Sequence, residues 1–449
     1  METLRLILAV LAVTFAGWNI LLIVSGKKLK LHLLEKMCLS YGLGLGVLSV
    51  EMFLFFFFNI KYGLKEILLP WVPIVIFNLV AGLKRTEPDN TYKDKISLLG
   101  IFLTAGITLE VLYAFFRALV RPLESYDSVA TYAIKSKIFY LAGAIPQGYF
   151  NGLGLLFPHV DYPLNIPLSQ TLMYIFMCSL NDQLVKAIFP LYFVAILGIL
   201  YYGIRRFAGR TYALVFIFIL ASIPQFNNFA TNAYIDVPLS YYYLTATLFL
   251  FYWFKEPDTI GFLYVSAIMT ALAGWTKNEG LVYCAINVIV LAIYLFSSRK
   301  GLEKKYLLRG IQYIVLVAVI LLPWLIIRKS AAVMNSDFGT LDAGRFDIVA
   351  QLRKVIPMFY EFQRQIFGPK KWNIFWIVFI IALVVYRKKL FTKYSRYITI
   401  PLVLVICGYI AAYLLTQITM PSLWSRLMLH FLPIAVYLLA LLFKGEVIE

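Results

Sequence analysis

Charged residues and cysteines are scarce in this chain of 449 residues. Asp, Glu, Lys and Arg make up 14% of it, whereas soluble domains carry about a quarter. The cysteines are Cys38, Cys178, Cys284 and Cys407. All of them lie in apolar runs and none forms a CxxC pair, so the sequence argues against a disulfide framework and against a cysteine zinc site.

Hydrophobic residues are abundant instead. They account for 61% of the chain, and the mean hydropathy is +0.81. So few polar residues cannot cover so much apolar surface, and a spanning helix needs about 20 apolar residues. We therefore predict an all-α, polytopic integral membrane protein with about thirteen transmembrane helices, at 6–24, 39–58, 66–82, 98–119, 184–203, 211–227, 237–254, 260–275, 281–297, 310–327, 372–386, 398–416 and 427–443.

The basic linkers between these runs set the orientation. The chain has 41 Lys and Arg against 23 Asp and Glu, and we attribute this excess to cytoplasmic loops rather than to nucleic-acid binding. The basic linkers are Lys27–Lys36, Lys84–Lys95, Arg205–Arg210, Arg299–Arg309 and Arg387–Arg396. If all of them are cytoplasmic, the N-terminus lies outside and the C-terminus inside, provided that the short apolar segment Pro167–Leu180 does not span.

Two long loops then lie on the outer side, at 120–183 and 328–371. The first contains Asp127–Lys137 and the second Phe346–Phe367, and both patterns predict interfacial helices. We divide the chain into an N-terminal extension of three helices (1–96), a core (97–300) and a C-terminal part (301–449).

Polar residues gather on the predicted outer face. A carboxylate there can act as general base on an acceptor hydroxyl. Lys and Arg can hold a lipid-linked phosphate and stabilise its growing charge. The candidates are Asp127, Lys135, Lys137, His159, Asp161, Tyr162, Asp236, Lys277, Glu279, Arg426 and His430.

The carboxylates and histidines also have structural interpretations. Asp127 and Asp236 stand where helices are expected to begin, and Asp is a favoured N-cap. His159 and His430 could bind a metal ion with Asp161, but they lack a ligand spacing. We predict no metal site and no required cofactor, with a divalent metal as the alternative.

The cations have structural interpretations as well. Lys135 and Lys137 could extend to lipid headgroups. Lys277 and Glu279 could form a solvated turn, and Arg426 could be an interfacial anchor at a helix start.

Five short motifs follow one another over about residues 98–300. They are Asp127–Ala133 (DSVATYA), Asp161–Leu164 (DYPL), Arg205–Gly209 (RRFAG), Tyr234–Pro238 (YIDVP) and Thr276–Gly280 (TKNEG). In these residues the chain resembles the polyprenyl-phosphate-sugar-dependent glycosyltransferases of the GT-C fold, relatives of the protein O-mannosyltransferases and of the lipid A aminoarabinose transferase. That family commonly has Asp-Glu in its first outer loop, whereas here Asp127 is followed by Ser128.

The resemblance implies an inverting transfer from a polyprenyl-phosphate sugar to an acceptor hydroxyl. Asp127 would be the general base or would orient the acceptor, and Asp236 would support it. The donor phosphate would be bound by Lys135 or Lys137 together with Lys277 and Arg426. Substrate-binding roles would fall to His159, Asp161, Tyr162, Glu279 and His430.

Two other functions compete with this one. A transporter or flippase for lipid-linked sugars should have charges near the membrane midplane and internal repeats, yet only Glu51 and Glu110 lie at depth and no repeat is evident. A glycan polymerase or ligase would use a lipid diphosphate. The sequence does not identify the sugar, nor whether the acceptor is a glycan, a lipid or a protein. We expect a bacterial or archaeal plasma membrane with the site on its outer face.

Overall fold

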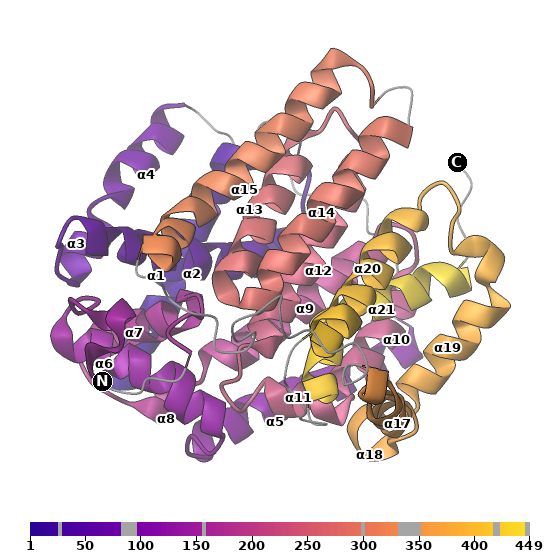
Figure 1. Cartoon of the computed structure of the whole chain (residues 1–449), viewed down its shortest axis with the longest axis horizontal. Helices are drawn as coiled ribbons and strands as arrows, with labels where there is room; N and C mark the ends of the chain where they lie inside the picture. Colours follow the sequence, from indigo (N-terminus) through magenta and orange to yellow (C-terminus); the bar gives the residue numbers. More distant parts are fainter. Residues whose placement is uncertain are drawn as a thin grey trace.

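The structure is a computed structural model that describes residues 1–25, 29–81, 97–154, 159–297, 301–330, 352–415 and 423–444. Within these residues all regular secondary structure is helical, which confirms the predicted class (Figure 1). Eight described helices are long and apolar enough to cross a membrane. They are α1 (Glu2–Ser25), α2 (Leu33–Phe57), α5 (Leu98–Val120), α9 (Ile188–Arg205) with the short α8 (Asp182–Val185) before it, α14 (Asn278–Ser297), α15 (Lys304–Ser330), α20 (Arg396–Leu415) and α21 (Leu423–Lys444).

The remaining predicted spans also contain helices, but several are shorter than expected. They are α3 (Leu64–Leu68) with α4 (Trp71–Val80), α10 (Arg210–Ala221), α12 (Asp236–Lys255), α13 (Ile260–Thr276) and α19 (Phe375–Val385). The predicted end of the run 211–227 is wrong, because Pro224 starts a separate helix, α11 (Pro224–Phe229). Proline lacks an N–H and disfavours helical backbone before it. The number of thirteen crossings stays a prediction.

Helix α12 lies at the centre of the bundle. Every residue from Asp236 to Phe254 is buried, and the helix packs against α13, α21, α9, α14, α20 and α2. The hydroxyl of Tyr241 donates to the Cys38 carbonyl oxygen of α2 (2.9 Å), and that of Tyr242 donates to the Gly42 carbonyl oxygen (2.8 Å). These bonds fix the N-terminal half of α12, and with it Asp236.

Helices α1 and α2 touch backbone to backbone. A Cβ added to Gly17 would lie 1.9 Å from the Ser40 carbonyl oxygen, and one added to Gly44 would lie 1.9 Å from the Val13 carbonyl oxygen. Such close approach is possible only for glycine. Helix α2 also packs on α9 and on α7 (Asn165–Met177), so these N-terminal helices are part of the body. The predicted domain boundaries stay predictions.

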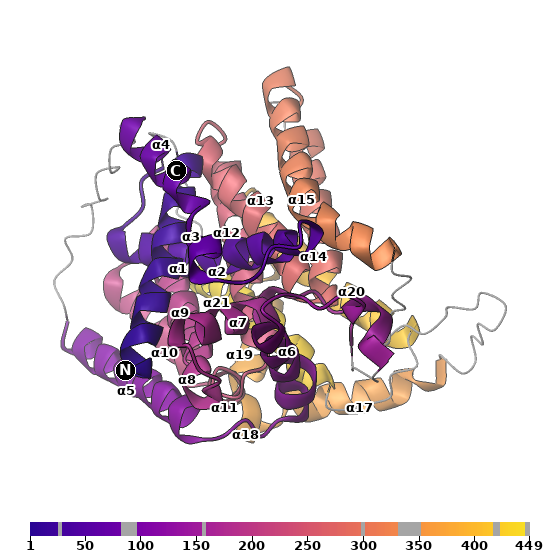
Figure 2. The ribbon, with the colours of Figure 1, turned by 90° about the vertical axis from the view of Figure 1, so that its left-hand side faces the viewer.

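The elements of the two long loops lie at one end of the bundle. A π-helix, η1 (Asp127–Ala133), continues into α6 (Ile134–Ala142), as expected for a helix over Asp127–Lys137. The short helix η2 (Tyr149–Gly154) follows, and the 13-residue α7 is buried and too short to span. Of the second predicted helix, residues 346–351 lie outside the described residues; the rest includes α17 (Val355–Ile366), which lies along the lower edge in Figure 2 beside α18 (Pro369–Trp372).

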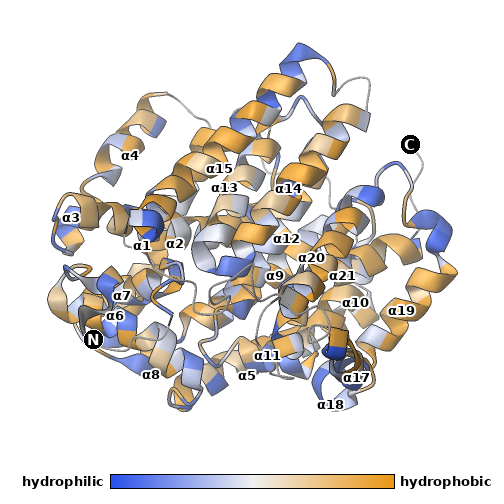
Figure 3. Ribbon diagram, in the orientation of Figure 1, coloured by the Kyte–Doolittle hydropathy of each residue, from blue (hydrophilic) through white to orange (hydrophobic). Residues whose placement is uncertain are grey.

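Polar residues gather at opposite ends of an apolar body. In Figure 1 the N-terminus, α6, α17 and α18 lie at the lower end, and α14 meets α15 at the upper end. Figure 3 shows hydrophilic residues at both of these ends and hydrophobic residues along α14, α15 and α19. Two predicted cytoplasmic linkers also meet, because Arg206 forms an ion pair with Glu35 (2.8 Å). This distribution is that of a multi-pass membrane protein.

Candidate functional site

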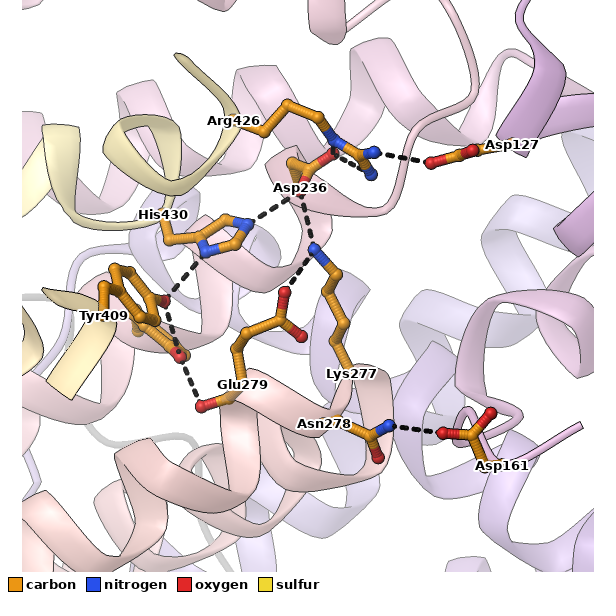
Figure 4. A network of polar contacts seen from close by, with 10 residues as sticks. Asp127, Asp161, Asp236, Lys277, Asn278, Glu279, Tyr409, Arg426 and His430 are labelled. Atoms are coloured by element: carbon orange, nitrogen blue, oxygen red, sulfur yellow. Dashed lines mark hydrogen bonds and ion pairs between the residues drawn. The ribbon is translucent and has the colours of Figure 1, made fainter. Parts of the chain in front are cut away.

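Arg426 joins the two candidate catalytic carboxylates (Figure 4). Its Nη1 lies 2.5 Å from Asp127 Oδ2, and its Nε donates to Asp236 Oδ2 (3.2 Å). Asp236 is fully buried, whereas 27% of the Asp127 side chain is exposed. Neither helix start uses its Asp as the N-cap, which is Tyr126 for η1 and Ile235 for α12. The capping interpretation is therefore wrong, and both side chains are free to face Arg426.

Lys277 holds the other side of Asp236. It lies in extended backbone between α13 and α14 and is almost completely buried. Its Nζ donates to Asp236 Oδ1 (3.1 Å) and lies 2.7 Å from Glu279 Oε1. Burial lowers the pKa of Lys277, but the carboxylates of Asp236 and Glu279 outweigh it, so the pKa lies above its usual range. Lys277 is therefore a permanent cation of the cluster and not part of a solvated turn.

His430 and Tyr409 continue the cluster into the bundle. His430 Nε2 lies 2.7 Å from Asp236 Oδ1, and His430 Nδ1 lies 2.8 Å from the Tyr409 hydroxyl. That hydroxyl lies 3.1 Å from the hydroxyl of Tyr243, which donates to the Glu279 carbonyl oxygen (2.8 Å). Both ring nitrogens of His430 are thus hydrogen-bonded within the protein.

We call this set the main cluster: Asp127, Asp236, Lys277, Glu279, Arg426 and His430. It combines a partly exposed carboxylate, a buried carboxylate and two cations. One oxygen of Glu279, Oε2, is buried and has no hydrogen-bond partner among the described residues, and the same holds for the hydroxyl of Tyr132. An arrangement of this kind can accept a proton at Asp127 and bind an anion at its cations.

A second polar cluster lies beside the main one. Asn278 donates to Asp161 Oδ2 (3.1 Å) and accepts a hydrogen bond from Arg328 (3.3 Å). Lys135 donates to the His159 carbonyl oxygen (2.6 Å). Burial lowers the pKa of Lys135 to about 7, although the carboxylate of Asp161 counteracts part of the shift. Successive residues of one junction therefore serve both clusters, because Lys277 and Glu279 belong to the first and Asn278 to the second.

The structure divides the predicted site residues into three groups. The first group is the six residues of the main cluster, which the structure brings together. The second cluster contains Lys135, His159, Asp161 and Tyr162, with the rings of His159 and Tyr162 4.4 Å apart. Lys137 is in neither group, because it forms an ion pair with Asp182 (2.5 Å).

Sequence reasoning missed several residues that extend the main cluster or belong to the second one. Tyr409 and Tyr243 stand inside apolar runs, where a tyrosine is ordinarily a packing residue. Arg328 belongs to none of the motifs, whereas Asn278 and Tyr132 belong to TKNEG and DSVATYA without being predicted as site residues. A tyrosine hydroxyl at the same depth as a charged helix end is the signal that could have identified Tyr409.

No group of three His, Cys, Asp or Glu side chains within the described ranges is arranged to hold a metal ion. The main cluster places Lys277 and Arg426 between its carboxylates. The expectation that no cofactor is required stays a prediction.

Comparison with known proteins gives one informative match. No family model matches the sequence, and no curated protein matches it either. Among solved structures, the fold is similar to the crystal structure of ArnT from Cupriavidus metallidurans bound to undecaprenyl phosphate, with a TM-score of 0.53 and 16% sequence identity. The match covers 77% of this chain and 60% of that chain. The similarity confirms the GT-C-like fold expected from the sequence.

Proposed function

We propose that this protein transfers a sugar from a polyprenyl-phosphate donor to an acceptor hydroxyl at the outer membrane face, with inversion. The observation that carries the proposal is the bridge from Arg426 to both Asp127 and Asp236. It holds the partly exposed carboxylate of Asp127 next to the buried carboxylate of Asp236 and the cation Lys277. The fold it shares with ArnT, which was crystallised with undecaprenyl phosphate, supports the class of donor.

In the proposed reaction Asp127 is the general base. It takes the proton of the acceptor hydroxyl as the acceptor oxygen forms a bond to the anomeric carbon. The bond from that carbon to the phosphate oxygen breaks, and its electron pair leaves with polyprenyl phosphate. Attack on the face opposite the leaving group inverts the anomeric carbon.

The cations receive the leaving phosphate. Arg426 and Lys277 stabilise the negative charge that grows on this phosphate in the transition state. Such electrostatic stabilisation by groups already held in position is usually the largest single contribution to catalysis. Lys135, in the second cluster, is a third candidate for this phosphate. The Oε2 atom of Glu279, which has no hydrogen-bond partner in the described part of the chain, is available to accept a hydrogen bond from a sugar hydroxyl.

A carrier function has less support from the contacts. Glu51 and Glu110 accept hydrogen bonds from Trp71 (2.8 Å) and Asn227 (3.0 Å) of other helices. Each carboxylate therefore links two helices, and among the described residues only the Glu51 Oε1 atom of this pair is buried without a hydrogen-bond partner. A transport pathway would need charges at that depth that are free to bind a substrate.

The test is release of polyprenyl phosphate by purified protein from a panel of radiolabelled polyprenyl-phosphate sugars, with crude membranes as the acceptor source. We expect release by the wild type and none by Asp127→Asn, which keeps the shape of the side chain but cannot take a proton. Donor binding by the variant should persist. Turnover by Asp127→Asn would refute the base, and release only from lipid-diphosphate sugars would favour a polymerase or ligase.

The same assay addresses the acceptor and the metal. Fractionating the membranes into protein, lipid and glycan shows which one becomes labelled. A rate that is unchanged by a chelator is the expected result, and a rate restored by a divalent cation would contradict it.

A further inference from the structure

A chain of four hydrogen bonds runs from the main cluster to the backbone of α14. It links Asp236 Oδ1 to His430, His430 to the Tyr409 hydroxyl, that hydroxyl to Tyr243, and Tyr243 to the Glu279 carbonyl oxygen, at 2.7, 2.8, 3.1 and 2.8 Å. All the side chains in it are buried. Figure 4 shows this chain leading away from the Asp236 carboxylate.

Both ends of this chain are acceptors, and that fixes the number of protons it needs. A carbonyl oxygen cannot donate, so Tyr243 gives its only hydroxyl proton to Glu279. Tyr409 must then donate to Tyr243, and His430 must donate to Tyr409 from Nδ1. A neutral imidazole has no further proton for Nε2, which faces a carboxylate oxygen. Four bonds therefore need four protons, whereas two tyrosines and a neutral histidine supply three.

The surroundings decide where the fourth proton resides. Asp236 already accepts from Lys277 and Arg426, and donors of this kind favour the ionised carboxylate. The main cluster has three carboxylates and two permanent cations, so with a neutral His430 it carries one net negative charge, and the carboxylate beside His430 is the fully buried Asp236. A proton on His430 neutralises that charge.

We propose that His430 is a positioning residue that holds the fourth proton as an imidazolium ion against Asp236. Asp236 is then an ionised anchor that receives three cationic donors and takes no proton in the reaction. Its task is to hold Lys277 and Arg426 in place opposite Asp127. This consequence for catalysis rests on the proposed function, but the protonation state does not.

The charged and titratable groups that face His430 come from two helices and one junction between helices. Asp236 and Tyr243 belong to α12, Tyr409 to α20, and Lys277 and Glu279 to the α13–α14 junction. Of these, Tyr243 is the most useful for a test. Without its hydroxyl, Tyr409 can turn its proton toward His430 Nδ1, and a neutral ring with a proton on Nε2 then makes every remaining bond.

The experiment is ¹⁵N NMR of histidine-labelled full-length protein in lipid nanodiscs. The chain has three histidines, so His430→Gln assigns the signal by difference. We expect both nitrogens of His430 to carry protons at pH 7 in the wild type. In Tyr243→Phe the signal should shift to that of a neutral ring, and the Nδ1 proton should be lost at a lower pH.

Tyr283→Phe is the matched control. Its hydroxyl donates to the backbone oxygen of Tyr243 (2.7 Å) and its ring stacks on that of Tyr243 at 3.7 Å, but it is not part of the chain of hydrogen bonds. Its His430 signal should match that of the wild type. A neutral His430 in the wild type at pH 7, or an unchanged signal in Tyr243→Phe, would overturn the proposal. The measurement needs no turnover, so failure of the transferase assay does not affect it.

Discussion

At the scale of single residues, the two catalytic candidates differ in what they can do. Asp236 is buried among Arg426, Lys277 and His430, which makes it a poor base. Asp127 is partly exposed and bonded to Arg426 alone in the main cluster, so it is the carboxylate that an acceptor can reach. Environment rather than residue type thus separates their roles.

Arg426→Lys tests the bridge. A lysine keeps the charge but offers a single ammonium group, which cannot replace a planar fork that contacts two carboxylates. We expect the transfer rate to fall by about 10²-fold or more, as for loss of one transition-state donor, with the protein still folded. Lys305→Met is the control, because it removes an exposed pair with Asp258 of little energetic value. Equal rates for Arg426→Lys and wild type would exclude the bridge from the reaction.

The lowered pKa of Lys135 leads us to expect that donor binding depends on pH. Its pKa is lowered to about 7 by burial, so it is cationic below that pH and neutral above it. If it binds the donor phosphate, affinity for a polyprenyl-phosphate sugar, whose phosphodiester keeps one negative charge throughout, should weaken as the pH rises from 6 to 8, by up to about tenfold. Lys135→Arg stays charged throughout and should lack this loss. Parallel binding curves for the two proteins would argue that Lys135 does not contact the phosphate.

At the scale of helices, the α1–α2 contact is the least tolerant feature. In Gly44→Ala the added methyl would clash with the Val13 backbone, which cannot move without separating the helices. Overpacking costs roughly 1–3 kcal/mol, and we expect a lower thermal unfolding midpoint in detergent. Gly408→Ala is the control, because its nearest contact is a Val282 methyl group at an ordinary 3.5 Å. An unchanged midpoint for Gly44→Ala would mean that the helices can separate without cost.

Helix α17 turns polar residues toward the protein and apolar residues outward. Its polar residues Glu361 and Gln365 are buried and bonded to each other, and Trp372 donates to Gln365. Its apolar residues Ile356 and Phe359 are 78% and 62% exposed. An apolar face turned outward suits a helix that lies in the lipid interface, as the sequence predicts.

At the scale of the whole molecule, the orientation in the membrane is the main open prediction. Lys354 precedes α17, and Lys388 belongs to η4 (Arg387–Lys389) in a predicted cytoplasmic linker. With the native cysteines replaced, Lys354→Cys should react with an impermeant thiol reagent from outside intact cells, and Lys388→Cys only after permeabilisation. The reverse labelling would place the main cluster on the cytoplasmic side.

The helices and much of the site could be predicted from the sequence. Long apolar runs and the distribution of basic residues carry enough information to place Asp127, Asp236, Lys277 and Arg426 at the same ends of different helices, and the structure brings these four together. What could not be predicted depends on side-chain direction. Nothing in the sequence separates Lys135 from Lys137, although one lies in the second cluster and the other pairs with Asp182.

The junction between α13 and α14 has one further consequence, which concerns sequence evolution. Lys277 and Glu279 face the main cluster and Asn278 faces the second, so a single inserted or deleted residue would exchange their partners and disrupt both clusters at once. In any set of relatives that share this site, these three positions should therefore align without gaps, while the lengths of the neighbouring loops are free to vary.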